Sequence, residues 1–562
     1  MTLSQILTNN KGRLAPFLVS LLIFLLYLLI AADSTLWDRD EPRYASVTVE
    51  MIRSGNYLVP TLDGQPWPDK PPLMYWLMSI PIRIFGPTAL ACRLFCVLGT
   101  AATCLLTYFI GKKLFSDRTA LFSMLILSSS LLIIFVGTAA IADGIVLPLI
   151  TAVMLIFVTA SGSKFGFAHF LLTGFFLGLA MLAKGPIGLL PLFVFFPVIL
   201  LTRKQAKENL RTFLYICLAA VLGCAIFLLW AIPANISAGG DFLKTFITRH
   251  IIGRATSPME HHGGNWFLYL PYYIPVIIVG FFPFILHLPG SLSALLGGRI
   301  ADRQTRILLI AWPLSIFLIM TIAATKLPHY ILFIWPSLAL IIAGAIDTSK
   351  KGLLTERDRK WLRGGIWFFA PVSFIFAAAC LAGPLILQRK TGLNIPALNW
   401  SLPLCGLTLI VFSVFAIYYQ LKEQFMKSSV TVLAGFAALL VPALLGGLPG
   451  IEQIKLPPRI AKIVIEKTDS NIPVYAYKFN EPSLNFYINR PIQRLAGEQD
   501  VADWLLQKQR GVLIIPKNIF DDLSGKSGQL PVEIIGSVKG INYSKGTLLD
   551  MLIVAKKESN LE

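Results

Sequence analysis

Apolar segments long enough to cross a bilayer recur along almost the whole chain and limit the folds open to it. A membrane-spanning helix needs about 20 mainly apolar residues, and 55% of the 562 residues are hydrophobic. About thirteen segments meet this length; they begin near Ala15, Ala91, Ala120, Ala140, Phe167, Pro186, Phe213, Phe267, Ile307, Tyr330, Gly364, Leu402 and Val430. The sequence therefore predicts an α-helical polytopic membrane protein. The segments at Ala140 and Pro186 also fit a hairpin or a re-entrant loop, because short links precede them.

Basic residues are spread unevenly over the loops between these segments. The net charge of +19 would suggest a nucleic-acid partner in a soluble protein, but here alternate short loops hold most of the Lys and Arg. The basic loops cover residues 112–118, 164, 203–211, 299–306, 350–363 and 422–427. Positive loops stay in the cytoplasm, so Lys11 and Arg13 are expected inside and the loop Trp37–Pro72 outside. Because thirteen is odd, the C-terminus is also expected outside, and no nucleic-acid partner is expected.

The character of the sequence changes after Leu448. Residues 472–477, 511–516, 532–536 and 548–554 read as short strands, and residues 501–507 read as an amphipathic helix. We therefore predict a transmembrane domain over residues 1–448 and a small soluble α/β domain over residues 449–562. Residues 33–85 would form the first outer loop, with helices along the membrane surface.

The first outer loop holds a dense group of charges between Asp38 and Tyr44. Charges beside a bilayer are costly unless they are solvated, paired or used. Pro42 suits a first helical turn, which places Asp40 and Glu41 at the positive end of a surface helix. Two interpretations stay open for these acids: a functional carboxylate, or simple capping of the helix by Asp38 or Asp40.

A second polar group in this loop is Asp69-Lys70, followed by two prolines. A residue before proline is pushed into an extended conformation, so a stiff segment presents both side chains ahead of the next helix. The pair is either part of a functional site or a structural ion pair.

Three further segments place polar residues on the same predicted face of the membrane. Asp143 stands near the outer end of a span, and residues 326–330 read Lys-Leu-Pro-His-Tyr. The loop between the seventh and eighth spans adds Lys244, Arg249, His250, Arg254, Glu260, His261 and His262. Lys and Arg can hold a phosphate, and a carboxylate can accept a proton or position an acceptor. No HExxH, Walker A, GxSxG or CxxC pattern is present, which argues against a zinc protease, an ATPase or a serine hydrolase.

These motifs carry a family resemblance. Asp-Glu-Pro-Arg-Tyr at residues 40–44, Asp-Lys-Pro-Pro-Leu-Met-Tyr-Trp at residues 69–76 and Lys-Leu-Pro-His-Tyr at residues 326–330 resemble the lipid A aminoarabinose transferases. That family lies within the polyprenyl-phosphate-sugar glycosyltransferases of GT-C type, which include the protein O-mannosyltransferases. The similarity extends through Lys184-Gly-Pro to Glu481-Pro-Ser-Leu-Asn-Phe-Tyr in the end domain and covers essentially the whole chain.

The resemblance implies roles for individual residues. Catalytic roles fall on Asp40, Arg43 and Asp143, and donor-phosphate binding falls on Lys70, Arg254 and Tyr330. Asp69 and His250 match a metal-contacting pair of the family, in which Glu is usual at the first position. No cofactor is therefore expected to be required, although a divalent metal such as Zn²⁺ could bind near Asp69 and His250.

We interpret the chain as a bacterial inner-membrane glycosyltransferase with its active site and end domain in the periplasm. Its partners would be the bilayer, an undecaprenyl-phosphate-linked sugar (4-amino-4-deoxy-L-arabinose) as donor, and lipid A phosphate as acceptor. One alternative is a related transferase acting on protein, polysaccharide or another lipid. The other is a lipid transporter, although inverted repeats and broken mid-membrane helices, which transporters usually show, are not evident.

Overall fold

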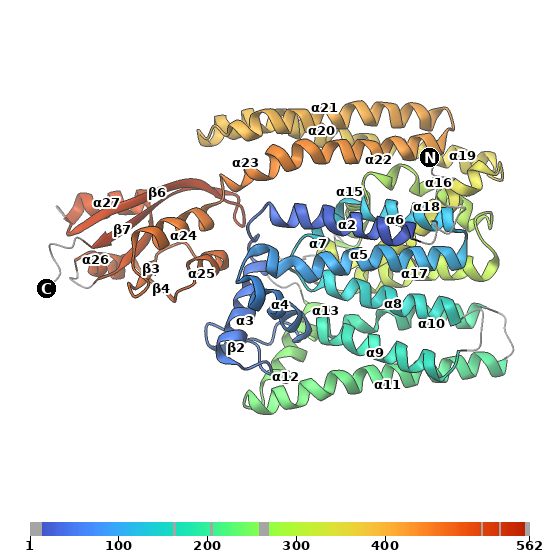
Figure 1. Cartoon of the computed structure of the whole chain (residues 1–562), viewed down its shortest axis with the longest axis horizontal. Coiled ribbons are helices and arrows are strands. Elements are labelled where there is room, and N and C mark those ends of the chain that lie inside the picture. The colour runs from blue at the N-terminus through green and yellow to red at the C-terminus, as the bar shows by residue number, and fades with distance from the viewer. Residues whose placement is uncertain are drawn as a thin grey trace. The chain divides into compact units, whose positions relative to one another are not determined.

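The computed structural model describes residues 14–160, 165–202, 206–257, 269–506, 510–527 and 530–556. The chain forms two compact units, whose elements are labelled in Figure 1. The first comprises Met1–Ala32, Thr48–Leu381 and Leu404–Val441, and the second comprises Asp33–Val47, Ala382–Pro403 and Pro442–Glu562. Several residues assigned above to loops lie outside the described residues, namely Lys11, Arg13, Lys164, Arg203, Lys204, Glu260, His261 and His262.

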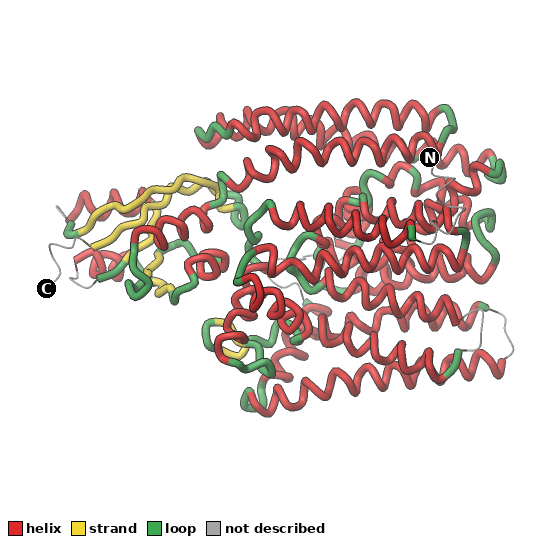
Figure 2. Tube along the Cα trace, viewed as in Figure 1, coloured by secondary structure: helices red, strands yellow, loops and turns green. Residues whose placement is uncertain are grey.

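In the described part of the first unit, the regular secondary structure is helical apart from one short hairpin, β1 (Thr61–Leu62) with β2 (Gln65–Pro66), as Figure 2 shows. Its first helices are α2 (Ala15–Ala32), α4 (Leu73–Phe85), α5 (Ala89–Leu114), α6 (Asp117–Ser128), α7 (Leu131–Gly137), α8 (Asp143–Ala160), α9 (Phe167–Lys184), η2 (Gly185–Leu189), α10 (Leu190–Leu201) and α11 (Ala206–Ser237). Then come α12 (Phe242–Thr245), η3 (Phe246–Gly253), α13 (Arg254–Thr256), α15 (Tyr273–Gly280), η4 (Phe284–Leu286), α16 (Leu288–Leu296), α17 (Arg303–Ile322), η5 (Pro328–Ile334) and α18 (Trp335–Lys350). The last are α19 (Glu356–Gly364), α20 (Ile366–Thr391), α21 (Pro396–Leu421) and α22 (Phe425–Pro442). The end of α20 from Ala382, the beginning of α21 up to Pro403, and Pro442 belong to the second unit.

Burial separates interior helices from helices that face lipid. In the most apolar window of Pro328–Lys350, 94% of the residues are buried, against 17% in Glu356–Thr391. A helix that is apolar all round and buried belongs to the core of a bundle, so α18 lies in the interior and α20 at the periphery. Helix α5 packs against α2, α6 and α8, and all three contacts belong to this unit (Figure 1).

The predicted polytopic helical fold is confirmed, but the count of thirteen spans is not. Among the described residues, ten helical stretches are long and apolar enough to cross a membrane, or eleven if the pair α6 and α7, bent by 69°, forms one span. Phe167–Leu201 forms one such stretch where the sequence predicts two. The segment predicted from Phe267 onward instead contains the short helices α15, η4 and α16.

Glycine fixes how closely α8 approaches α5. A Cβ atom on Gly144 would lie only 2.8 Å from the Cβ of Cys96 on α5, closer than real side chains pack. Small residues at such a crossing let two membrane helices approach at the backbone. The first turn of α8, which carries Asp143, is therefore held firmly against α5.

The second unit is built around a five-stranded sheet. Its elements are η6 (Ala443–Gly447), α23 (Leu448–Glu452), α24 (Leu456–Lys467), β3 (Val474–Ala476), α25 (Pro482–Ile488), β4 (Ile492–Arg494), α26 (Glu498–Leu506), β5 (Val512–Pro516), α27 (Lys517–Ser527), β6 (Val532–Asn542) and β7 (Thr547–Lys556). The strand order is β4-β3-β5-β7-β6. Strand β3 runs parallel to β4 and β5, whereas β7 runs antiparallel to β5 and β6. This confirms the small C-terminal sheet; the boundary between residues 448 and 449 stays a prediction.

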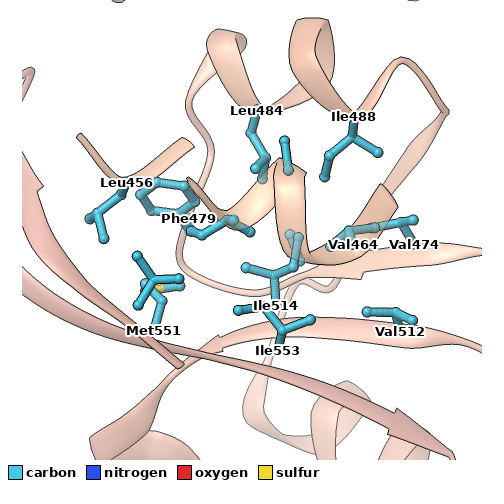
Figure 3. Packing of buried hydrophobic residues seen from close by; sticks show 14 residues of the cluster. Leu456, Val464, Val474, Phe479, Leu484, Ile488, Val512, Ile514, Met551 and Ile553 are labelled. Carbon is cyan, nitrogen blue, oxygen red and sulfur yellow. The ribbon is translucent and has the colours of Figure 1, made fainter. Parts of the chain in front are cut away.

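Helices cover both faces of this sheet. Successive residues of a strand point to opposite faces, so Val512 and Ile514 join one apolar cluster and Leu513 and Ile515 join the other. The first cluster contains residues of α24 and α25, and Figure 3 shows how closely its side chains pack. The second contains residues of α26 and α27. All of β5 is buried, as expected for the central strand of a three-layer α/β domain.

The segment Asp33–Val47 packs with the end domain and belongs to its unit. The carboxylate of Asp38 accepts hydrogen bonds from the backbone N–H of Ser483 (2.9 Å) and from its hydroxyl (2.5 Å). The Nζ of Lys455 lies 3.6 Å from the ring centroid of Trp37, within the range of a cation–π contact. Residues 33–47, the first part of the predicted outer loop, are thus a structural part of the sheet-containing unit.

Candidate functional site

Asp69 is the centre of a group of charged side chains in the first unit. It lies in the segment before α4, and its side chain is 13% exposed. One oxygen, Oδ2, is 3.0 Å from the Nζ of Lys70, while Oδ1 is 3.0 Å from the Nδ1 of His250 and 3.4 Å from a guanidinium nitrogen of Arg254. Burial opposes ionisation of this carboxyl, yet Lys70, His250 and Arg254 together hold the pKa of Asp69 well below its usual range.

A π-helical turn brings two of these partners together. Residues Phe246–Gly253 form η3, and α13 follows it directly with Arg254 as its first residue. Such turns occur often at functional sites. His250 and Arg254 both reach Asp69, and Arg254 also donates a 2.8 Å hydrogen bond to the hydroxyl of Tyr330.

A buried ion pair lies next to this group. The Nζ of Lys184 is 2.6 Å from each carboxylate oxygen of Asp143, and both side chains are almost completely buried. Asp143 stands in the first turn of α8, where the helix dipole favours an anion, and Lys184 ends α9, where it favours a cation. Gly185 follows with φ of 65°, a conformation that suits glycine, so the chain leaves α9 directly after Lys184.

Tyr330 joins the two halves of the arrangement. Its hydroxyl accepts from Arg254, and its ring lies 4.9 Å from the Nζ of Lys184. His329 adds an imidazole nitrogen 3.8 Å from Asp143. We call the eight residues Asp69, Lys70, Asp143, Lys184, His250, Arg254, His329 and Tyr330 the charged cluster. Three cationic side chains face two carboxylates in it, so the charged cluster suits an anion such as a phosphate.

The structure thus brings together all five predicted donor-phosphate and metal-pair residues, with Asp143 of the catalytic set beside them. These are Lys70, Arg254 and Tyr330 of the donor-phosphate set, Asp69 and His250 of the metal pair, and Asp143 of the catalytic set with its partner Lys184. The roles themselves stay predictions.

Asp40 and Arg43 belong to the other unit. They lie one turn apart on α3 (Asp40–Ser54), where a guanidinium nitrogen of Arg43 is 3.8 Å from Asp40. Asp40 is 53% exposed, so its carboxylate is accessible to a ligand. Their catalytic roles also stay predictions.

The neighbouring acids of the first loop have structural partners. Asp38 is bound to Ser483, as described above, and Glu41 accepts a 2.7 Å hydrogen bond from the backbone N–H of Trp37. Burial raises the pKa of Asp38, while the hydrogen bonds from Ser483 oppose that rise. These contacts give Asp38 and Glu41 structural partners, and the functional and the capping interpretation both stay open for Asp40.

Two members of the charged cluster, Lys184 and His329, were not among the site residues predicted from the sequence. The signal for Lys184 was its place as a lone basic residue in one of the short loops expected outside, which otherwise hold few basic residues. Lys326 has a different role, because its Nζ donates to the backbone carbonyls of Met320 and Thr321 at the end of α17, where a cation favourably caps a helix.

The surroundings of Asp69 do not fit a metal ion. A structural zinc site takes four ligands and a catalytic one at least three, whereas no group of three His, Cys, Asp or Glu side chains suited to a metal occurs among the described residues. The oxygens of Asp69 face Lys70 and Arg254, whose positive charges would repel a cation. The expected divalent metal therefore stays an untested prediction, and no chemical step is assigned to it.

Similar proteins give the arrangement a context. Residues 69–231 match the family model of dolichyl-phosphate-mannose-protein mannosyltransferases. The undecaprenyl phosphate-α-4-amino-4-deoxy-L-arabinose arabinosyl transferase of Pectobacterium carotovorum is 31% identical over 399 residues, which are 69% of each chain. The protein of the same name from Edwardsiella ictaluri is 28% identical over 76% of each chain. The protein from Proteus mirabilis whose name is the same apart from a final number 2 is 31% identical, over 61% of this chain and 62% of its own.

The fold has a close counterpart among solved structures. The crystal structure of ArnT from Cupriavidus metallidurans bound to undecaprenyl phosphate superposes with a TM-score of 0.73, covering 98% of this chain and 99% of that one. The two sequences are 19% identical. The match shows that helical unit and end domain follow one known architecture.

Proposed function

The chain belongs to the undecaprenyl phosphate-α-4-amino-4-deoxy-L-arabinose arabinosyl transferase family, and from this premise we propose that it moves 4-amino-4-deoxy-L-arabinose from undecaprenyl phosphate to a phosphate of lipid A. It is a multi-spanning membrane glycosyltransferase that uses a polyprenyl-phosphate-linked sugar. Family membership removes the lipid-transporter alternative. The sugar and the acceptor are part of the proposal, as is the periplasmic side for the reaction.

The reaction breaks one bond and forms one. An oxygen of the acceptor phosphate attacks the anomeric carbon of the sugar, while the bond from that carbon to the donor phosphate breaks. The electron pair leaves with undecaprenyl phosphate, which gains negative charge as the bond lengthens. An ionised phosphate acceptor needs no base, so the main demand on the protein is to stabilise the leaving phosphate.

The charged cluster meets this demand, and it is the observation that carries the proposal. Lys70 and Arg254 supply the cations, and Tyr330 adds a hydroxyl that can donate to a phosphate oxygen. Asp69 contacts both cations and holds them at fixed positions before the substrate arrives. Donors placed in advance at the developing charge stabilise a transition state without reorganisation.

A membrane-embedded bundle suits a donor with a lipid anchor. Because the donor's tail stays in the bilayer, its phosphate reaches only the membrane surface.

Asp40 is proposed to orient the incoming acceptor oxygen at the sugar carbon, or to take its proton when the acceptor is a hydroxyl.

The test is sugar transfer by the purified enzyme, followed by mass spectrometry of the product. Supplied with undecaprenyl-phosphate-linked 4-amino-4-deoxy-L-arabinose and lipid A, the wild type should add one aminoarabinose to a lipid A phosphate. Lys70→Ala should reduce turnover about tenfold or more, because a charge-assisted hydrogen bond contributes about 1.5–3 kcal/mol. Lys70→Arg should restore only part of it, since a planar guanidinium differs from an ammonium.

Lys390, an exposed lysine near the end of α20, provides the matched control. Lys390→Ala should keep full turnover. When a protein or a glycan is supplied beside lipid A, aminoarabinose attached to one of these with lipid A left unmodified would overturn the acceptor assignment. Full turnover by a well-folded Lys70→Ala enzyme would overturn the role of the charged cluster.

A further inference from the structure

The first unit contains a hollow whose lining shares no residue with the charged cluster. Its volume is about 790 Å³, and its walls come from α15, η4, α16, α19 and the start of α20. Pockets that take small molecules usually measure about 300–1,000 Å³. The hollow, which we call the basal groove, is therefore large enough for a ligand.

The walls of the basal groove are apolar. Ile277 and Ile278 of α15, Leu292 of α16 and Phe368 of α20 line it. Trp361 of α19 lies at the same groove with half of its surface exposed. Tryptophan gathers at the boundary between lipid and water, so this part of the groove suits the level where a lipid's chains meet its headgroup.

Cationic side chains line the groove beside Trp361. Arg299 is paired there with buried Asp358, Nε to Oδ2 at 2.5 Å. Arg357 is a second lining cation, and it is exposed to solvent. No carboxylate within the described ranges forms an ion pair with Arg357, so the groove carries one positive charge in excess.

The groove lies among the loops that are richest in basic residues. Residues 299–306 contain three arginines, and residues 350–363 are densely basic. Such loops face the cytoplasm, which places the basal groove at the inner leaflet, provided that the proposed orientation holds. The inner leaflet is the one that carries anionic lipid.

We propose that the basal groove binds one anionic phospholipid of the cytoplasmic leaflet. Its acyl chains lie against α15, α16 and α20, and its phosphate pairs with Arg357. Basic pockets between membrane helices on the cytoplasmic side are a known mode of anionic-lipid recognition. A zwitterionic lipid would fill the same apolar walls but carries no net charge for the excess cation.

Native mass spectrometry of the full-length, delipidated protein tests this. We expect phosphatidylglycerol to bind as a single tight copy, about tenfold tighter than phosphatidylcholine. Arg357→Glu should remove that preference. Lys360→Glu, the same charge change at an exposed position of α19 that does not line the groove, should keep it. Equal binding of the two lipids by the wild type, or an unchanged preference in Arg357→Glu, would overturn the proposal.

A second variant tests the apolar walls. Leu292→Trp should fill the groove and remove the tight copy. Gel filtration and the melting temperature report whether this variant is folded. If it is not, Arg357→Glu, at an exposed position, takes its place in the test. Undecaprenyl phosphate is the competitor. Failure to displace phosphatidylglycerol supports a separate site, whereas displacement from the wild type would assign the groove to the donor's tail and overturn the proposal. Transfer assays at Lys70 remain independent of either result.

Discussion

The carboxylate of Asp69 faces both cations that we assign to the donor phosphate. Because Lys70 and Arg254 hold its pKa below the usual range, Asp69 stays ionised throughout the pH range of ordinary assays. A lowered pKa in the folded state also stabilises the fold at every pH above the pKa of the unfolded chain, about 3.9 for Asp. That contribution disappears as the pH falls below this value.

This gives a prediction for Asp69→Asn. The variant should melt at a lower temperature than the wild type by a constant margin between about pH 5 and pH 8. The margin should shrink below about pH 4, because the unfolded wild-type chain then takes up a proton on Asp69 while the folded protein keeps the carboxylate ionised. Melting curves of both proteins in the same detergent across that range measure it. A margin that stays the same at pH 3.5 would show that the charge of Asp69 adds nothing to stability.

Asp40 separates a catalytic role from helix capping in a single substitution. Asparagine keeps the shape and capping ability of aspartate but lacks its charge. Asp40→Asn should leave the melting temperature near normal while turnover falls about 10²-fold, the scale of one acid–base group. Near-normal turnover would reduce Asp40 to a cap. Asp38→Asn, at the position bound to Ser483, is the comparison and should affect melting more than chemistry.

At the scale of elements, the ion pair between Asp143 and Lys184 ties α8 to α9. Removing one partner of a buried pair leaves an uncompensated charge and costs about 3–5 kcal/mol. Lys184→Met alone should therefore lower the melting temperature strongly. The double variant Asp143→Leu with Lys184→Met should recover much of the loss, because neither charge is then left alone. A double variant as unstable as the sum of both single ones would contradict this.

Sequence reasoning found the elements whose pattern is local. The predicted strands over 511–516 and 548–554 lie within one or two residues of β5 and β7, because alternation of apolar residues is visible in a short window. Strand β4 has three residues and escaped notice. The span count is not confirmed, and the described residues differ from it where helices are interrupted. There η2 continues Phe167–Leu201, and the chain around Pro283 breaks into short helices.

The charged cluster shows the same limit. Asp69 and Lys70 are neighbours in the chain, so their pairing was visible in advance. Asp143 and Lys184 lie 41 residues apart, and their contact depends on how α8 and α9 pack. Spacing along the chain carries no signal for such a pair, whereas a lone lysine at a membrane boundary does.

For the whole molecule, orientation in the membrane is the main open expectation. A reporter that is active only outside the cytoplasm should work when fused after Ser54 or after Asp500. A fusion after Lys360, in the basic loop, should be inactive and serves as the control. Activity after Lys360 with inactivity after Ser54 would invert the chain in the bilayer and place the charged cluster on the cytoplasmic side.

The contact between Asp38 and Ser483 has a consequence for how such a chain can change over time. The two residues are 445 positions apart, yet each supplies the other's hydrogen-bond partner inside one folded unit. A substitution at Ser483 alone would remove the hydroxyl that donates to the partly buried carboxylate of Asp38, which is costly. These positions should therefore be inherited as a pair, and an end domain exchanged between two relatives should function only when residues 33–47 travel with it.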